Sequence, residues 1–341
     1  MGLTNEQLRK IKEELDNCNN PLFFFHDDPD GVCSYLQFYK YKKEGHGVSV
    51  KSYPTVDKRF LRRVEEYNPD KIFVLDLANI HEEFMEKVKV PIIWIDHHGP
   101  FDPGKALYFN PRNNGNESIP VTALCYHVLR QDLWLAVIGS FGDWYYPDFA
   151  EEFSKLYPDI LPPGMTDPET VLFETEMKTL VRIFSFMLMG KSNDAMKYAI
   201  AMGRIEGPRE LLNKETPRAK FILKKYDEIN KEFTSLLQQA KAVDATGKLV
   251  LYSYANPKYS LSKDIANELS HLYPDKVIVV GRVDKGEVKM SLRSRHHDLP
   301  KIIDFALVGL TGYGGGHEYA AGACVKEDDF SRFLERMKEK L

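Results

Sequence analysis

The sequence predicts an α/β protein with a mostly parallel N-terminal sheet and flanking helices, a helical connector, and a smaller C-terminal α/β domain. In the first half, short apolar runs alternate with amphipathic stretches of helical period, which is typical of consecutive βαβ units. From about residue 150 to 243 long helical patterns replace the strand signal, and strands return after Gly247. We therefore expect three parts, which span residues 1–150, 151–243 and 244–341.

The elements of the first part follow from the spacing of its apolar residues. The expected strands are 22–25, 48–53, 71–77 and 91–96, and the expected helices between them are 32–43, 58–67 and 81–88. Short connections and a βα order favour parallel strands covered by helices. Residues at the carboxyl ends of such strands lie at one edge of the sheet, which is where ligands bind in open α/β sheets.

The connector and the tail differ in pattern. The connector contains two long stretches of helical period, 174–191 and 221–242. The pattern of the tail predicts a compact α/β unit with the size of an ordinary small domain. Its expected strands are 249–254, 276–283, 286–294 and 322–327, and its expected helices are 261–272, 301–308 and one at the C-terminus.

Composition narrows the class of protein. The chain has 341 residues, of which 43% are hydrophobic and 28% are charged, and this composition is typical of a soluble globular protein. Because the net charge is −4, any contact with nucleic acid would depend on local basic surface. The start lacks an apolar signal segment and no stretch reaches the length of a membrane span, so we expect a cytoplasmic protein with no membrane partner. The four cysteines show no CxxC spacing and predict neither a zinc knuckle nor disulfides.

Aspartate and histidine side chains cluster in the first half, where we expect apolar strands to end on one rim. Crowded carboxylates repel one another, and burying them unpaired is unfavourable, so a cation is expected among them. Oxygen and imidazole ligands without thiolate favour Mn²⁺ or Mg²⁺, with histidine favouring Mn²⁺, and there are enough ligands for two ions. Taken singly, each aspartate could be a helix cap or a turn former. Each of four groups is expected just past an apolar strand: His26-Asp27-Asp28-Pro29-Asp30-Gly31, Asp76, Asp96-His97-His98, and Asp143 in the turn-like GSFGDW.

In this order, HDDPDG, the lone aspartate of VLDLA, the Asp-His-His triplet and the aspartate of GSFGDW resemble the four motifs of the DHH phosphoesterase superfamily, which includes RecJ-like exonucleases, oligoribonucleases and manganese pyrophosphatases. The likeness continues in the tail. There GGGHEYAAG (314–322) is similar to the GGGH…AAG signature of the DHH-associated domain, and SLRS (291–294) resembles the strand that carries its phosphate-binding arginine. The resemblance covers residues 22–143 and 249–325.

The resemblance implies a set of site residues. One ion would be held by His26, Asp28 and Asp76, and a second by Asp30, Asp76, His97 and Asp143, so that Asp76 bridges. The two divalent cations, Mn²⁺ by preference or Mg²⁺, would activate a water that attacks phosphorus. Asp96 would fix a histidine tautomer and His98 would touch the phosphate or the leaving oxygen.

The tail would bind the substrate. Glycines let backbone N–H groups approach an anion closely, and we expect His317 to add a donor at the start of a helix. Arg293 can bind a phosphate in a bidentate manner. The alternative interpretation of the glycine run is a tight turn. The alternative interpretation of the basic stretch around 295–297 is a solvated charged hairpin. The expected substrate-binding residues are Arg293, Gly315, Gly316 and His317.

The leading functional hypothesis is a manganese-dependent exonuclease that releases nucleoside monophosphates from single-stranded DNA or RNA. The resemblance is closest to archaeal RecJ-like proteins, whose expected partners are a repair helicase or a replication protein. Since the chain lacks room for the additional domain of bacterial RecJ, we expect 3′→5′ polarity. The alternatives are a hydrolase of very short oligoribonucleotides or small phosphoesters, and a replication or repair scaffold without catalysis.

Overall fold

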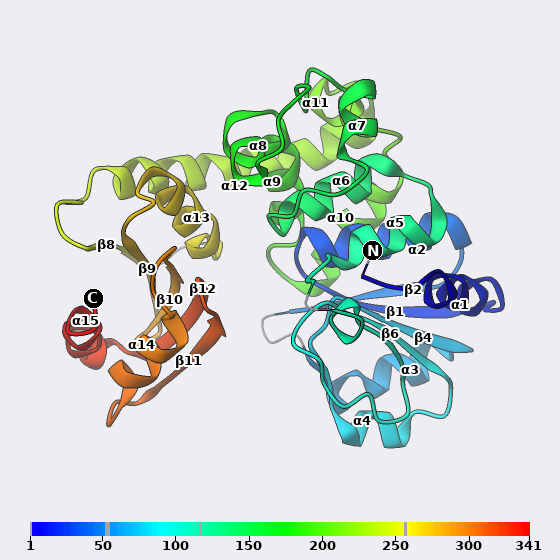
Figure 1. The fold of residues 1–341 in the computed structure, drawn as a ribbon, viewed down its shortest axis with the longest axis horizontal. Coiled ribbons are helices and arrows are strands. Elements are labelled where there is room, and N and C mark those ends of the chain that lie inside the picture. The colour runs from blue at the N-terminus through cyan, green and yellow to red at the C-terminus, as the bar shows by residue number, and fades with distance from the viewer. Residues whose placement is uncertain (1, 52–54, 116, 256–257) are drawn as a thin grey trace. The chain divides into compact units, whose positions relative to one another are not determined.

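A computed structural model describes residues 2–51, 55–115, 117–255 and 258–341 (Figure 1). The chain forms two compact units, Met1–Tyr226 and Asp227–Leu341. All regular elements of the expected connector in the described part of the chain are helices, and most of them belong to the first unit. No helix in the described ranges combines the length and the apolar character that crossing a bilayer requires.

The first unit contains a five-stranded sheet in the order β2-β1-β4-β6-β7, in which all neighbours are parallel. This confirms the predicted sheet. The strand β7 was missed because it has only three residues and is partly exposed, so it lacks an apolar run. Residues 52 and 53 of the expected strand 48–53 lie outside the described residues. The strands are β1 (Pro21–His26), β2 (His46–Val50), β4 (Lys71–Leu75), β6 (Ile92–Ile95) and β7 (Leu107–Phe109), and a separate parallel pair is β3 (Thr55–Val56) and β5 (Asn79–Ile80).

Both faces of this sheet are covered, which explains why its strands read as continuous apolar runs. Successive residues of β1 point to opposite faces. Phe23 packs edge-on against Tyr35 and Phe38 of α2 (Pro29–Lys42). Phe24, its neighbour in sequence, packs edge-on against Phe84 of α4 (Glu82–Lys87) on the other face. Figure 1 shows α2 and α4 on opposite sides of the sheet.

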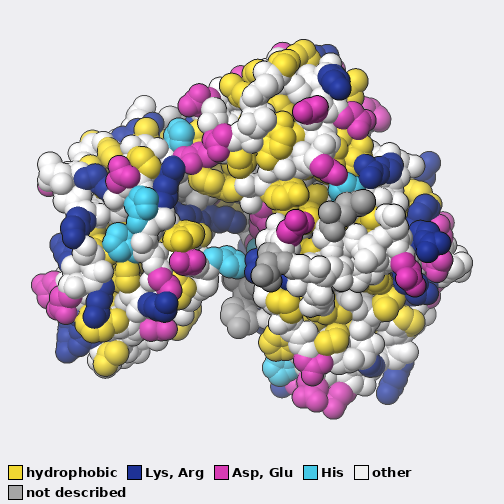
Figure 2. Space-filling model, viewed as in Figure 1, with side chains coloured by type: hydrophobic (Ala, Val, Ile, Leu, Met, Phe, Trp, Pro, Cys, Tyr) yellow, Lys and Arg dark blue, Asp and Glu magenta, His cyan; other side chains and the backbone are white. Residues whose placement is uncertain are grey.

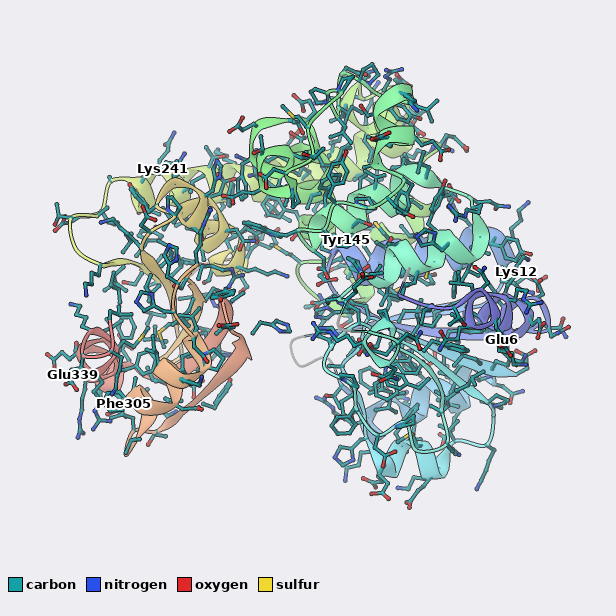
Figure 3. The ribbon with its side chains drawn as sticks, viewed as in Figure 1. Glu6, Lys12, Tyr145, Lys241, Phe305 and Glu339 are labelled. Carbon is teal, nitrogen blue, oxygen red and sulfur yellow. The ribbon has the colours of Figure 1, made fainter. Side chains whose placement is uncertain are left out.

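Further helices complete the first unit. Lys12 of α1 (Asn5–Asp16), labelled in Figure 3, donates hydrogen bonds to Asp16 and to Tyr41 of α2, which ties α1 to the sheet's helical layer. Helix α2 begins at Pro29 rather than at the predicted Val32, because Asp28 caps it and proline is well suited to the first turn. The remaining helices are η1 (Lys58–Phe60), α3 (Leu61–Tyr67), η2 (Pro111–Asn113), α5 (Val121–Leu129), α6 (Leu133–Gly142), α7 (Ala150–Leu156), α8 (Pro168–Glu174), α9 (Met177–Met187), α10 (Ser192–Gly203), α11 (Pro208–Leu212) and α12 (Pro217–Lys241).

The second unit contains a mixed five-stranded sheet in the order β11-β12-β10-β9-β8. Its core includes Val279, Leu292, Ile303 and Phe333, which join the sheet to the last two helices. The predicted strands and helices of the tail are confirmed, with small shifts at their ends. The elements are β8 (Leu249–Ala255), α13 (Ser262–Leu272), β9 (Val277–Asp284), β10 (Glu287–Arg293), α14 (Leu299–Leu307), β11 (Gly312–His317), β12 (Ala320–Lys326), η3 (Glu327–Asp329) and α15 (Phe330–Lys338).

Two local expectations were wrong. Asp143 does not follow a strand: it is the C-cap of α6. His317 does not start a helix: it ends the edge strand β11, which pairs with β12 in a hairpin. In both cases a glycine-rich segment looked like a turn, although GSFG continues a buried helix and GGGH extends along a neighbouring strand.

Surface charge is mixed. Figure 2 shows acidic and basic side chains interspersed over the visible face, as a net charge of −4 among 96 charged groups suggests, since 46 are basic and 50 acidic. The cysteines Cys18, Cys33, Cys125 and Cys324 are all buried and free.

Candidate metal centre

The candidate site lies at the carboxyl edge of the parallel sheet. His26 is the last residue of β1, Asp76 follows β4 and Asp96 follows β6. The chain turns sharply after β4, and Asp76 adopts a left-handed backbone conformation with φ of 57°. Such a conformation is uncommon for residues other than glycine, although aspartate adopts it more readily than most, and strained backbone is often kept at functional sites. The expected convergence of these strand ends is confirmed.

The N-terminus of α2 adds two carboxylates to this edge. The carboxylate of Asp28 accepts a hydrogen bond from the backbone N–H of Gly31 at 3.1 Å and caps the helix. Gly31 is required here because a Cβ atom would collide with the backbone of His26. The helix can therefore begin directly above the end of β1. Asp30, in the first turn of the helix, is fully buried.

A first group combines His26, Asp28 and Asp76. The Nδ1 atom of His26 lies 3.0 Å from Oδ2 of Asp28 and 3.3 Å from Oδ2 of Asp76. One ligand atom from each of the three lies within 4.8 Å of the others. These are the three residues that the resemblance implies around one ion, and their role as ligands stays a prediction.

A second group combines Asp30, His97 and Asp143, again with ligand atoms within 4.8 Å of one another. The Nε2 atom of His97 lies 3.8 Å from Oδ2 of Asp30 and 3.3 Å from Oδ2 of Asp143. Asp143 reaches the site from the C-terminus of α6, although a helix end was not anticipated as its source. The structure thus brings together three of the four residues expected around the second ion, and Oδ1 of the fourth, Asp76, lies 3.3 Å from Nε2 of His97.

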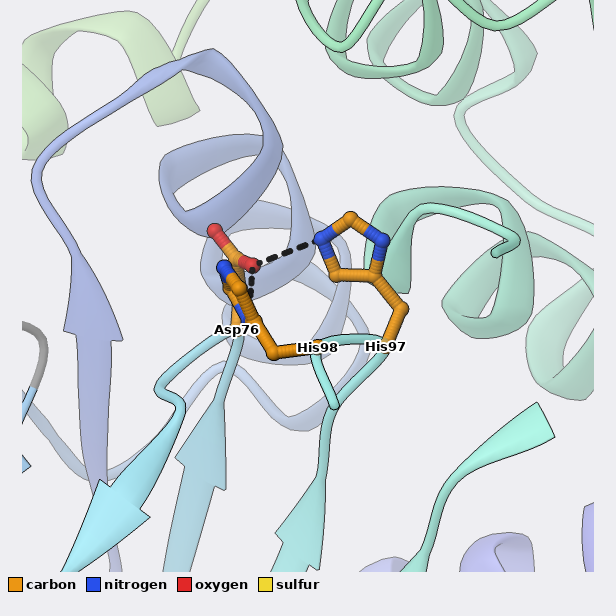
Figure 4. A group of neighbouring side chains, drawn as sticks. All are labelled: Asp76, His97 and His98. Atoms are coloured by element: carbon orange, nitrogen blue, oxygen red, sulfur yellow. Dashed lines mark ion pairs between the residues drawn. The ribbon is translucent and has the colours of Figure 1, made fainter. Parts of the chain in front are cut away.

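Asp76 joins the two groups. Its Oδ2 atom faces His26, while its Oδ1 atom lies 3.3 Å from Nε2 of His97 and 3.9 Å from Nδ1 of His98. Figure 4 shows the two histidine rings approaching the same carboxylate oxygen. This arrangement fits the bridging position that the resemblance implies.

Charge and burial make this edge suited to cations. Oδ1 of Asp76 is buried and accepts no hydrogen bond from a described residue. Burial and the neighbouring Asp76 and Asp143 carboxylates raise the pKa of Asp30 well above its usual value. Burial lowers the pKa of His97, but Asp76, Asp143 and Asp30 outweigh it and raise that pKa to about 10. The carboxylates therefore attract positive charge, and two divalent cations would satisfy them with oxygen and imidazole ligands.

Asp96 orients His98. Asp96 is fully buried, and its Oδ1 atom lies 2.7 Å from Nδ1 of His98. Its Oδ2 atom accepts a hydrogen bond from the backbone N–H of His98 at 3.1 Å. Burial lowers the pKa of His98, whereas Asp96 and Asp76 raise it, and the net shift is upward. A carboxylate on one ring nitrogen fixes the tautomer and leaves Nε2 for another partner.

Three contacts around the histidines were not anticipated. Ser118 Oγ lies 3.0 Å from Nδ1 of His97, and Nε of Arg112 donates to the backbone oxygen of His97 at 2.8 Å. Asn110 donates to the backbone oxygen of His98 at 3.0 Å. Nothing in their spacing singles these residues out, because the loop that carries them joins the site only through folding.

The expected substrate-binding residues all belong to the second unit. Arg293 ends β10, where Nε donates to Oδ1 of Asn267 at 2.7 Å and Nη1 donates to the Leu292 oxygen at 2.7 Å. Burial lowers the pKa of Arg293 to about 10. Gly315 and Gly316 of the exposed strand β11 pair with Gly322 and Ala321 of β12, and His317 is the last residue of β11.

Comparisons with known proteins agree with this architecture. The DHH family, N-terminal domain, matches residues 22–137, and the DHHA1 domain matches residues 247–341. RecJ from Thermus thermophilus in complex with Mn²⁺ is similar to this chain, with 15% sequence identity and a TM-score of 0.70. The match covers 100% of this chain and 55% of that RecJ, so this chain spans about half of its length. An exonuclease RecJ bound to manganese is similar at 15% identity and a TM-score of 0.63, covering 100% of this chain and 95% of that one.

A smaller enzyme shares the fold. PggH from Vibrio cholerae, a pGpG-specific phosphodiesterase, is similar at 14% identity and a TM-score of 0.50, covering 94% of this chain and 98% of that one. No curated protein matches the sequence. At these identities the likenesses show the fold, and the activity has to be argued from the site.

Proposed function

Because the chain carries the N-terminal domain of the DHH family and a DHHA1 domain, we propose that it is a metal-dependent phosphodiesterase that removes nucleoside monophosphates from single-stranded DNA or RNA. The observation that carries this proposal is the Asp76 carboxylate. Its two oxygens face His26 and His97 from two separate ligand groups, and one of them is buried without a hydrogen bond from a described residue. Manganese is the preferred ion in this proposal, magnesium the second, and the expected polarity is 3′→5′.

Each side chain has a defined task in the proposed reaction. Divalent cations at this edge would polarise the phosphate and lower the pKa of a water molecule there. Asp28, Asp30, Asp76 and Asp143 would provide the negative charge that holds such ions, with His26 and His97 as neutral ligands. Oriented by Asp96, His98 would present Nε2 to a phosphate oxygen or to the leaving oxygen.

The second unit would hold the remainder of the substrate. In this proposal Arg293 and the hairpin that contains Gly315, Gly316 and His317 bind phosphate groups. A helicase or a replication protein is the expected partner class, and the cytoplasm the expected location.

A second candidate is a hydrolase of very short oligonucleotides. The fold shared with a pGpG-specific phosphodiesterase of nearly the same length supports it, because each chain covers almost all of the other. The two candidates differ in the minimum length and maximum length of the strand that is cut. A scaffold without catalysis has less support, since all the expected ligand positions are filled by Asp or His.

The experiment is digestion of end-labelled single-stranded DNA and RNA, from dinucleotides to long strands, with Mn²⁺, Mg²⁺ or a chelator. A manganese-dependent ladder on long strands supports the exonuclease and shows its polarity, whereas cleavage confined to the shortest strands supports the second candidate. Asp76→Asn should abolish the activity. The matched control is Asp304→Asn, which removes an exposed carboxylate of α14. If neither long nor short strands are cut, the scaffold is the function to pursue.

A further inference from the structure

A pocket of about 940 Å³ lies in the first unit along the outer edge of β2. Strand β2 is at the end of its sheet, and no strand among the described residues pairs with that edge. Side chains of α2, α3, α10 and α12 complete the walls. The volume falls in the range of about 300–1,000 Å³ that is usual for small-molecule sites.

The lining is cationic. Arg63, Lys197, Arg204 and Arg218 line the pocket, and none of its described lining residues is Asp or Glu. This is a marked local excess in a chain of net charge −4. Arg63 and Arg218 are paired with Glu66 and Glu210, neither of which lines the pocket. Lys197 and Arg204 form no ion pair within the described part of the chain, so they remain available to an anion.

The lining also presents aromatic rings. His46 stacks on Tyr67 with ring centroids 4.1 Å apart, and Phe221 is 36% exposed although it is a large apolar side chain. Lys197 lies over the Phe221 ring at 5.1 Å, so a charged and a planar surface adjoin each other. The Phe221 ring also stacks on Tyr198 with ring centroids 4.9 Å apart, so exposed His46 is the ring that a planar base would meet. An exposed ring next to cations suits a ligand that carries both a planar base and a phosphate.

A buried polar atom faces the same space. Ser49 lines the pocket from β2, is 4% exposed, and its Oγ makes no hydrogen bond with a described residue. Buried hydroxyl groups are almost always hydrogen-bonded, so an unsatisfied one indicates a missing partner. A ligand with donors and acceptors on its ring would provide that partner.

The pocket is distinct from the candidate metal centre. His46 is paired with Leu22 near the start of β1, at the end of the sheet opposite the metal edge. Ser49, the lining residue furthest along β2, is paired with Phe25, one residue before His26. None of the predicted metal ligands lines the pocket.

We propose that this pocket binds a nucleotide, with the phosphate held by Lys197 and Arg204 and the base placed against His46, with Ser49 as a hydrogen-bonding partner. The site takes free mononucleotides and does not require a divalent cation. It is independent of the phosphodiesterase function proposed above, because the binding uses neither the metal centre nor the tail.

The test is calorimetric titration of the full chain carrying Asp76→Asn, in a chelating buffer, so that binding at the metal centre is suppressed. The probes are AMP, adenosine, inorganic phosphate and a single-stranded oligonucleotide. AMP should bind, and it should bind more tightly than either adenosine or phosphate alone. Lys197→Ala with Arg204→Ala should weaken AMP binding by about a hundredfold, since two charge-assisted contacts are removed.

The matched control is Arg9→Ala with Lys89→Ala, which removes the same charge from exposed positions outside the pocket and should leave AMP binding unchanged. Thermal unfolding of each variant checks that the chain is folded. The proposal is wrong if AMP shows no binding at about 1 mM, if the pocket variant binds AMP as well as the control, or if phosphate alone binds equally tightly. Binding of the oligonucleotide without AMP binding would also overturn it, because the edge would then be part of a strand path. Loss of nuclease activity has no bearing on this readout.

Discussion

The buried carboxylate of Asp30 accepts a 2.6 Å hydrogen bond from the backbone N–H of Thr122, in the first turn of α5. Its other oxygen accepts the N–H of Val121 at 2.9 Å. An aspartate at this position accepts hydrogen bonds from helix N–H groups that would otherwise be unpaired. Its negative charge also interacts favourably with the positive end of the helix dipole. One predicted metal ligand therefore also joins α2 to α5.

This double role predicts a loss of stability without metal. Asp30→Asn relieves the repulsion from Asp76 and Asp143 but leaves one of two buried N–H groups without an acceptor. We expect the lost hydrogen bond to dominate and to lower the free energy of unfolding by about 1–3 kcal/mol. The measurement is urea denaturation in a chelating buffer, with Asp304→Asn as the control. Equal midpoints for the variant and the wild type would show that these hydrogen bonds contribute nothing.

Added Mn²⁺ should stabilise the wild-type chain. Cations that bind the folded state alone increase the unfolding free energy by about 2.7 kcal/mol at a concentration one hundred times the dissociation constant. The midpoint of thermal unfolding should therefore rise with Mn²⁺ concentration in the wild type and in Asp304→Asn, and far less in Asp76→Asn. An identical rise in Asp76→Asn would place the binding of the ion elsewhere.

Ser118 should orient the His97 ring for metal binding. Because Ser118 Oγ contacts the ring nitrogen of His97 that faces away from the carboxylates, Ser118→Ala should weaken manganese affinity or cleavage by about 10–100-fold. The residue to compare is the exposed Ser331, whose change to Ala should have no effect. Titration with Mn²⁺ and initial rates measure the two effects, and equal values for both variants would remove Ser118 from the site.

The two glycines of the hairpin should differ in tolerance. Both have positive φ, 158° for Gly315 and 139° for Gly316, but an added Cβ at Gly316 would lie 2.7 Å from the backbone of Ala320 and Ala321, whereas a Cβ at Gly315 meets nothing within 4 Å. Gly316→Ala should therefore destabilise the chain by about 1–3 kcal/mol, and Gly315→Ala by clearly less. Denaturation followed by circular dichroism compares them, and the opposite order would contradict the backbone geometry of β11.

Arg293 tests the proposed role of the second unit. Arg293→Ala should weaken binding of single-stranded oligonucleotides by about tenfold, since a charge-assisted phosphate contact is lost. Binding is measured by fluorescence anisotropy with Asp76→Asn as the background, so that the strand is not cut. Lys289→Ala on the same strand is the control. An unchanged affinity for Arg293→Ala would exclude this arginine from phosphate binding.

Local patterns were sufficient for most of the architecture. The apolar runs of β1, β4 and β6 predicted a parallel sheet because strands buried on both faces cannot alternate with polar residues. The same order predicted that His26, Asp76 and Asp96 meet at one edge, since parallel strands end on the same side. The four motifs identified the superfamily, and both domain matches agree with it.

What only the tertiary structure decided depends on contacts between segments far apart in the chain. Asp143 reaches the site from a helix end, and Ser118 meets His97 through a loop, so no local period indicates either arrangement. Asp30 accepts a hydrogen bond from Thr122 of α5, which is 92 positions away in the sequence. The cationic pocket beside β2 is likewise built from side chains of four helices, because a helical pattern reveals which face is apolar but not which distant residues it packs against.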